Sequence, residues 1–137
     1  MKQFIGHTSL LVKDYDDAID FYVNKLHFKL IEDTHIGEGK RWVLIAPKGA
    51  SEFSLLLAKA TSEKQLEKVG NQTGGRVFLF LYTDDISRDY KNLLEQHITI
   101  IREPKKEPYG TVAVFADIYG NQWDLIEPEI KKQNQIL

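Results

Sequence analysis

The chain has 137 residues with 18 basic and 20 acidic side chains, and 42% of its residues are hydrophobic. This length fits one domain that folds around its own core without disulfides or a structural metal. The absence of cysteine excludes thiol catalysis and cysteine-ligated metal centres, and the net charge of −2 gives nucleic-acid binding no electrostatic support. No apolar run approaches the roughly 18 residues of a membrane span. No signal-peptide core precedes the first strand pattern, so we expect a cytoplasmic protein.

Each half of the chain predicts the same order of elements. In the first half we expect a strand over 3–12, a helix over 14–25 that Asp14 caps, extended chain over 28–32, a hairpin turn within 35–40, strands over 41–46 and 52–58, a short helix within 61–69 and a loop over 70–75. In the second half we expect a strand over 76–82, a helix over 84–96, extended chain over 98–102, a solvated turn over 104–108, and strands over 111–117 and 122–127.

The two halves overlay with one ungapped shift, which places His7 on Arg76 and Leu55 on Asp124. A period this long does not suit a solenoid, and it favours two related modules that share one sheet. The sequence therefore predicts an α+β domain of two βαβββ modules. Module one covers about 3–58, a linker about 59–74 and module two about 75–128, and a polar tail follows over 129–137.

Several motifs resemble the vicinal-oxygen-chelate superfamily, which includes glyoxalase I, bleomycin- and fosfomycin-resistance proteins and extradiol dioxygenases. In the first half they are His7-Thr-Ser-Leu-Leu-Val-Lys-Asp14, Ala18-Ile-Asp-Phe-Tyr22 and Lys25-Leu-His-Phe28; in the second half they are Gly74-Gly-Arg-Val77, Arg102-Glu-Pro104, Phe115-Ala-Asp-Ile-Tyr-Gly-Asn121 and Trp123-Asp-Leu-Ile-Glu-Pro128. The resemblance implies a cupped mixed sheet, a homodimer, and a ligand inside the cup. It does not imply one activity, because the fold hosts unrelated reactions.

The resemblance also implies four metal-ligand positions, on the first and fourth strand of each module. His7 and Asp124 could ligate a divalent metal ion, but Leu55 has no donor atom and Arg76 has no lone pair to offer. The substitutions argue against a complete metal site. Strand parity places Glu127 on the face opposite Asp124, so Glu127 is a poor replacement ligand.

Strand alternation predicts an apolar, aromatic cup with a few polar groups. Its expected lining is His7, Ser9, Phe53, Leu55, Leu57, Arg76, Phe78, Phe80, Gln122, Asp124 and Ile126. Arg76 and Asp124 have two interpretations: an ion pair that fills a vacated metal site, or an arginine that receives a carboxylate, phosphate or phosphonate of the ligand. His7 is either a hydrogen-bonded pocket residue or the general base.

Three functions follow from these expectations. The first is a glyoxalase/bleomycin-resistance-type protein that binds a small molecule, anionic in one interpretation, without a complete metal site. The second is a divalent-metal-dependent lyase or dioxygenase with a reduced site built on His7 and Asp124. The third is a non-catalytic ligand-sensing or structural dimer. Whether the chain is an enzyme stays open at this point.

Overall fold

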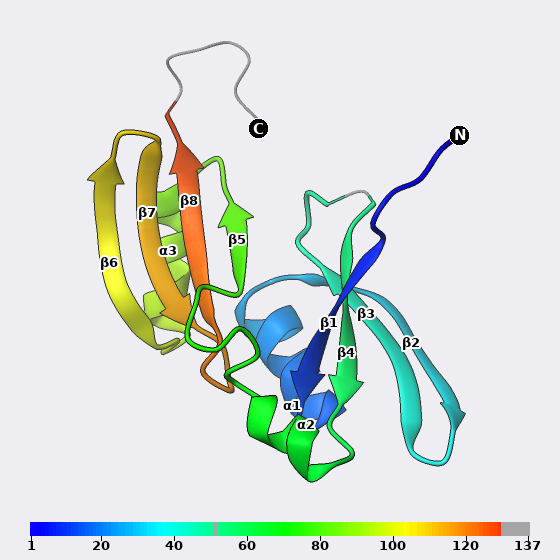
Figure 1. The fold of residues 1–137 in the computed structure, drawn as a ribbon. Helices are drawn as coiled ribbons and strands as arrows, with labels where there is room; N and C mark the ends of the chain where they lie inside the picture. Colours follow the sequence, from blue (N-terminus) through cyan, green and yellow to red (C-terminus); the bar gives the residue numbers. More distant parts are fainter. Residues whose placement is uncertain (51, 130–137) are drawn as a thin grey trace. The chain divides into compact units, whose positions relative to one another are not determined.

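The computed structural model describes residues 1–50 and 52–129, and the predicted polar tail lies almost wholly outside them. The chain divides into two units, Met1–Gln72 (unit 1) and Thr73–Leu137 (unit 2). Each unit has its own four-stranded mixed sheet (Figure 1). None of the helices in the described ranges is long and apolar enough to cross a membrane.

Unit 1 is built on the sheet order β1-β4-β3-β2, in which β1 and β4 run parallel and the other pairs are antiparallel. Its elements are β1 (His7–Val12), α1 (Tyr15–Ile19), the π-helix η1 (Asp20–Lys25), β2 (Lys29–Gly37), β3 (Lys40–Ala46), β4 (Ser54–Lys59) and α2 (Glu63–Lys68). Leu10, Val12, Leu55 and Leu57 are almost fully buried in its core.

The first helix begins where the sequence predicts. The Asp14 side chain accepts a hydrogen bond from the Asp17 backbone N–H at 2.8 Å, which satisfies one of the free donors at the helix start. The predicted single helix then widens into η1, where the Leu26 N–H donates to the Phe21 carbonyl, five residues back. Phe21 and its neighbour Tyr22 are both buried there.

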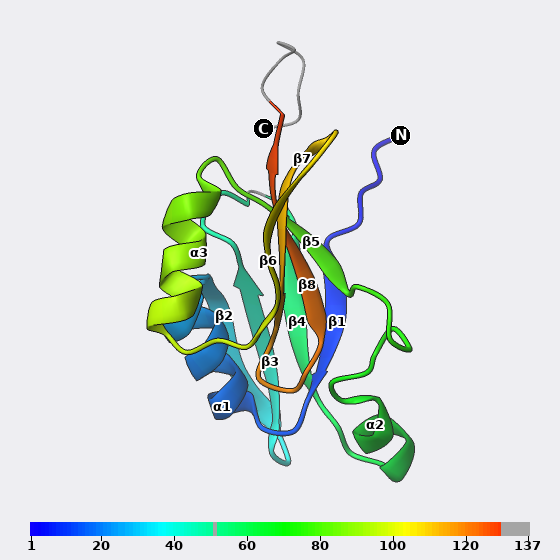
Figure 2. The same cartoon turned by 90° about the vertical axis from the view of Figure 1, so that its left-hand side faces the viewer.

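Unit 2 repeats this order with a β5-β8-β7-β6 sheet. Its elements are β5 (Leu79–Tyr82), α3 (Ile86–Glu95), β6 (Ile100–Glu107), β7 (Gly110–Ala116) and β8 (Gln122–Pro128). Figures 1 and 2 show α3 along one face of this sheet. On that face Leu125 and Phe115 are almost fully buried, as is Leu93 of α3.

The predicted α+β class and the βαβββ order of both modules are confirmed, but several details of the prediction are wrong. Backbone pairing in the described residues forms two separate sheets in place of one shared sheet. The turn expected over 104–108 is strand as far as Glu107. Pro104 is tolerated there because β6 is an edge strand, where a missing N–H removes no ladder bond. The hairpin turn expected over 35–40 is shorter, because β2 continues to Gly37 and β3 begins at Lys40.

The single ungapped shift between the halves is also corrected. In unit 1, His7 pairs with Ser54, 47 residues along the chain. In unit 2, Leu79 pairs with Trp123, 44 residues along the chain. Because the two spacings differ, no single shift can match the first and the fourth strand of both modules at once.

Candidate functional site

One face of the unit 1 sheet carries the polar residues of β1. Leu10 and Val12 are buried, whereas His7 and Ser9, which alternate with them, are exposed. The register pairs His7 with Ser54 across the parallel β1–β4 ladder, so the two side chains share a face. We call this the His7 face, and it consists of His7, Ser9 and Ser54.

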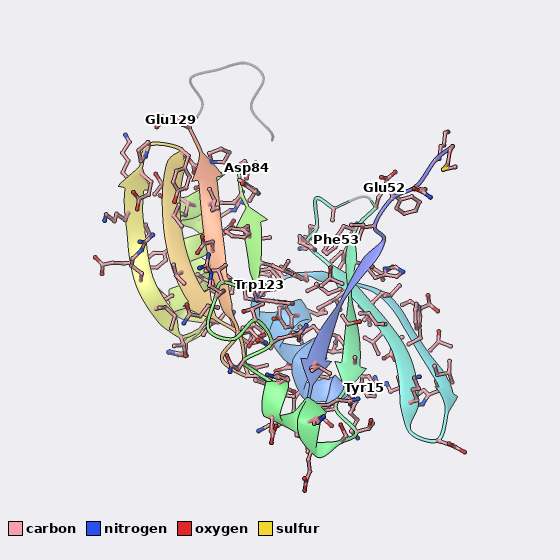
Figure 3. All side chains as sticks on the ribbon, in the orientation of Figure 1. Tyr15, Glu52, Phe53, Asp84, Trp123 and Glu129 are labelled. Carbon is pink, nitrogen blue, oxygen red and sulfur yellow. The ribbon has the colours of Figure 1, made fainter. Side chains whose placement is uncertain are left out.

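The structure places Leu55 away from the His7 face, contrary to the prediction. Leu55 pairs with Thr8 and is only 1% exposed, in the core next to Leu57. The ungapped shift matched Leu55 with Asp124 and so assigned Leu55 to the same lining as His7, which reversed the parity of β4. Phe53 lies just before β4 and is half-buried (Figure 3).

His7 is held by two neighbours that the sequence did not reveal. Its Nδ1 lies 2.7 Å from the Ser54 hydroxyl oxygen, and Ser54 is only 6% exposed. Its ring meets the Trp42 ring edge-on, with 5.9 Å between the centroids. The Ser54 hydroxyl therefore engages one ring nitrogen of His7.

The free edge of β1 is covered by a side chain from the segment that the sequence predicts as a linker. The Gln72 carboxamide accepts a hydrogen bond from the Leu11 N–H at 2.9 Å and donates one to the Ser9 carbonyl at 2.6 Å. A single amide thus makes the pair of bonds that a neighbouring strand would make. This contact fixes the backbone of the His7 face.

The second candidate face lies in unit 2. Phe80 and Tyr82 alternate with the less exposed Leu79 and Leu81 along β5, and they are 58% and 44% exposed. We call this the Asp124 face; its members, joined by the β5–β8 register, are Phe80, Tyr82, Gln122, Asp124 and Ile126.

Glu127 lies on the other face of β8, as strand parity predicts. Its carboxylate accepts a hydrogen bond from the Ile86 N–H at 2.8 Å, at the start of α3. An acidic group at this end of a helix is favourable because the free N–H groups there carry positive charge. Glu127 thus has a structural partner and is turned away from Asp124.

Asp124 is a half-buried carboxyl group. Burial raises the pKa of Asp124, and the positive charge of Arg102 opposes that rise. Arg102 lies in the same cross-strand row, because Asp124 pairs with Val114 and Val114 pairs with Arg102. Arg102 also lies 3.8 Å from a carboxylate oxygen of Glu107.

Arg76 and Phe78 lie just before β5. Arg76 is exposed, and among the described residues its guanidinium forms no ion pair, so the predicted pair with Asp124 is not formed there. The Phe78 ring meets the ring of Trp123 edge-on at 5.9 Å between the centroids. Trp123, which Figure 3 labels, is buried. Phe78 is thereby anchored to the core of unit 2.

The described residues offer few donors for a metal centre. Within residues 1–50 and 52–129, no three His, Cys, Asp or Glu side chains come together in a group that could hold a metal ion. The two ligands expected from the resemblance belong to different units, His7 to unit 1 and Asp124 to unit 2. The neighbours that contact the His7 ring are a serine hydroxyl and an indole.

Comparisons with known proteins give consistent matches. Residues 4–125 match the Glyoxalase/Bleomycin resistance protein/Dioxygenase superfamily. An uncharacterized protein from Shewanella frigidimarina is 57% identical over 128 residues, which are 93% of this chain and 95% of the relative. The crystal structure of UcmS2 is 30% identical with a TM-score of 0.80, and covers 92% of this chain and 98% of its own. The crystal structure of TnmS3, an antibiotic binding protein from Streptomyces sp. CB03234, is 33% identical with a TM-score of 0.77, and covers 93% of this chain and 98% of its own.

Proposed function

Because this chain belongs to the Glyoxalase/Bleomycin resistance protein/Dioxygenase superfamily, we propose that it binds a small aromatic molecule and does so without a metal ion. The observation that carries the proposal is the Asp124 face, where exposed Phe80 pairs with the half-buried Asp124 and exposed Tyr82 follows two residues farther along β5. The 33% identity to an antibiotic binding protein supports a binding function.

The aromatic side chains supply the affinity in this proposal. Exposed apolar groups in one patch are unfavourable in water, and covering them with a planar ligand recovers that free energy. Phe80 and Tyr82 present rings that suit offset or edge-on contact with an aromatic ligand. A few polar groups beside such rings then fix the orientation of the ligand.

Unit 2, which carries these rings, also offers polar groups for this purpose. They are Arg76, Gln122 and Asp124. Arg76 has no ion-pair partner in the described part of the chain, so its guanidinium is available for a carboxylate, phosphate or sulfonate of the ligand. The proposed ligand is therefore an aromatic anion.

Metal-dependent lyase or dioxygenase chemistry is the competing function. It needs a divalent ion held by several protein ligands with one position open to substrate. Ser54 and Trp42, whose side chains contact His7, are poor ligands for such an ion. We therefore favour binding over metal-assisted turnover.

The proposal is tested with anilinonaphthalene sulfonate, a fluorescent aromatic anion, by calorimetry in the presence of EDTA. We expect saturable binding at a fixed stoichiometry, weakened about three- to tenfold by Arg76→Gln, because a hydrogen bond to a charged group is lost. Arg88→Gln is the matched control, since Arg88 is occupied by Asp84 and Asp89. Near-ultraviolet circular dichroism verifies that each variant keeps its native packing.

The opposite result is equally specific. Tight, stoichiometric Ni²⁺ or Zn²⁺ binding that His7→Ala abolishes would overturn the metal-free proposal and favour the lyase or dioxygenase. Native protein that binds neither dye nor metal would favour the structural or sensing dimer.

The proposed assembly is a homodimer in the cytoplasm. Light scattering of the purified protein should give twice the chain mass of 15.8 kDa. A mass equal to one chain contradicts the dimer. The cytoplasmic location stays a prediction from the sequence, and cell fractionation tests it.

A further inference from the structure

The Ser54 hydroxyl under His7 is the feature that carries a further inference. Ser54 is 6% exposed and lies at the start of β4. Among the described residues, its hydroxyl has one hydrogen-bond partner, Nδ1 of His7 at 2.7 Å. No buried side-chain nitrogen or oxygen in the described chain lacks a hydrogen-bond partner, so this contact satisfies the hydroxyl.

The direction of this hydrogen bond follows from the donors and acceptors that Ser54 and His7 can offer. A serine hydroxyl has one hydrogen to donate, and a buried donor left unpaired costs free energy. Since Nδ1 is the only hydrogen-bond partner of this hydroxyl among the described residues, the assignment that pairs the buried hydrogen has Ser54 donating it to Nδ1. A neutral imidazole accepts at one nitrogen only, so the ring proton must lie on Nε2. The Nε2–H has no protein partner in the described part of unit 1, and the ring is exposed.

We propose that Ser54 is the positioning residue that holds neutral His7 as an Nε2–H donor, so that a small molecule bound on the His7 face presents an acceptor oxygen to His7. The edge-on contact with Trp42 restricts the ring plane from a second side. An aromatic carboxylate fits this donor, whereas an ammonium group, which has no lone pair to accept with, does not. The claim about the ligand rests on the proposed function; the claim about the proton does not.

This assignment replaces the general-base role that the sequence suggests for His7. A base must offer a lone pair, and the outward nitrogen carries a proton instead. Metal ligation through Nε2 is disfavoured for the same reason. The proton would have to move to Nδ1, and the buried Ser54 hydroxyl would then lose its acceptor.

The experiment is a two-bond ¹⁵N–¹H correlation spectrum of the ¹⁵N-labelled full chain, without ligand, at a pH at which imidazole rings are neutral. We expect His7 almost entirely as the Nε2–H tautomer, with its Nδ1 shift showing an accepted hydrogen bond. Exposed His97 serves as the reference in the same spectrum, where it should show the mixture of the two tautomers that is expected of an unconstrained imidazole. The hydrogen bond from Ser54 should make the ratio of the Nε2–H to the Nδ1–H tautomer about tenfold higher in His7 than in His97, because that is the effect of one net hydrogen bond.

The variants separate positioning from folding. Ser54→Ala should move the His7 tautomer ratio to that of His97, Ser54→Thr should restore it because the hydroxyl is kept, and Ser9→Ala is the control on the same face. An Nδ1–H tautomer in the unaltered protein would overturn the inference. An unchanged ratio in Ser54→Ala would also overturn it.

The ligand claim is tested by titrating the same sample with benzoate and with benzylamine. Benzoate should shift the His7 Nε2 signal, and benzylamine should leave it unchanged. A protein in which benzoate leaves His7 unchanged contradicts the ligand claim even where the dye binds with the expected dependence on Arg76. The two proposals therefore fail separately.

Discussion

At the scale of single residues, the clearest structural role belongs to Asp117, in the turn before β8. Its side chain accepts hydrogen bonds from the N–H groups of Tyr119 and Asn121 and from the Asn121 side-chain amide, each at 2.9 Å. Asp117 and Asn121 are 5% and 3% exposed. The Asp and Asn of the motif therefore build the turn that leads into Gln122 and Asp124.

We predict that Asp117→Ala lowers the free energy of unfolding by about 3 kcal/mol, because buried donors lose a charged acceptor. Urea unfolding measures this change. Asp84→Ala is the control, because the Asp84 side chain is largely exposed and its ion pair with Arg88 is worth little. A change below about 1 kcal/mol in Asp117→Ala would contradict the assigned role.

Asp124 gives a prediction for pH. Burial raises the pKa of Asp124 above its ordinary value of 3.8, so the folded state holds this proton more tightly than the unfolded state. Stability then falls as the pH rises through the interval above 3.8, because ionisation of Asp124 is harder in the folded protein. Asp124→Asn should remove this loss.

The measurement is urea unfolding of the native protein and of Asp124→Asn between about pH 4 and pH 7. As the pH rises, the free energy of unfolding of the variant should increase relative to that of the native protein. The increase should be less than about 1 kcal/mol, because the carboxylate is partly screened by solvent. If the native protein instead becomes more stable relative to the variant over this interval, the charge of Arg102 has a larger effect on the pKa of Asp124 than burial has.

At the scale of elements, β1 is an edge strand, and one side-chain amide bonds two backbone groups on its free side. Gln72 bonds to the Leu11 N–H and the Ser9 carbonyl. An uncovered edge strand is a template for pairing with another chain. The contact therefore protects the edge that carries the His7 face.

We predict that Gln72→Ala raises the hydrogen-exchange rate of the Leu11 amide about tenfold, the effect of one lost hydrogen bond. Gln65→Ala is the matched control, because Gln65 bonds within its own segment to Thr61. Equal exchange of Leu11 in both variants would show that Gln72 does not protect β1.

The elements also show how far the sequence can specify the candidate faces. In β8, the polar Gln122 and Asp124 alternate with the apolar Trp123 and Leu125, so parity alone gives the correct face. In β4, Leu55, Leu56 and Leu57 form an unbroken apolar run without alternation. Nothing in that run distinguishes its two faces, and a shift taken from the other half supplied the wrong one.

The contacts that hold His7 could not be predicted from the sequence for a different reason. Ser54 and Gln72 lie 47 and 65 residues after His7 in the sequence, and a lone serine or glutamine has no characteristic spacing from a histidine. Their roles depend on the β1–β4 register and on the path of the chain after α2. Sequence periodicity predicts helices and strands. Side-chain partners such as Ser54 and Gln72 can be identified only once the pairing of distant strands is known.

At the scale of the whole molecule, the proposed function links ligand binding to stability. A ligand that binds only the folded chain stabilises it by about 2.7 kcal/mol at 100 times its dissociation constant. For a chain of this length each kcal/mol corresponds to roughly 2–4 °C, so the dye should raise Tm by roughly 5–10 °C. We expect the same rise with and without EDTA.

The variants locate this stabilisation on the Asp124 face. Phe80→Ala should remove most of the rise in Tm because the ligand loses an exposed aromatic contact. Leu94→Ala, which removes an exposed apolar side chain from α3 of the same unit, should keep the full rise. If EDTA abolishes the rise and Zn²⁺ restores it, binding depends on a metal ion, and the metal-dependent alternative replaces the proposed function.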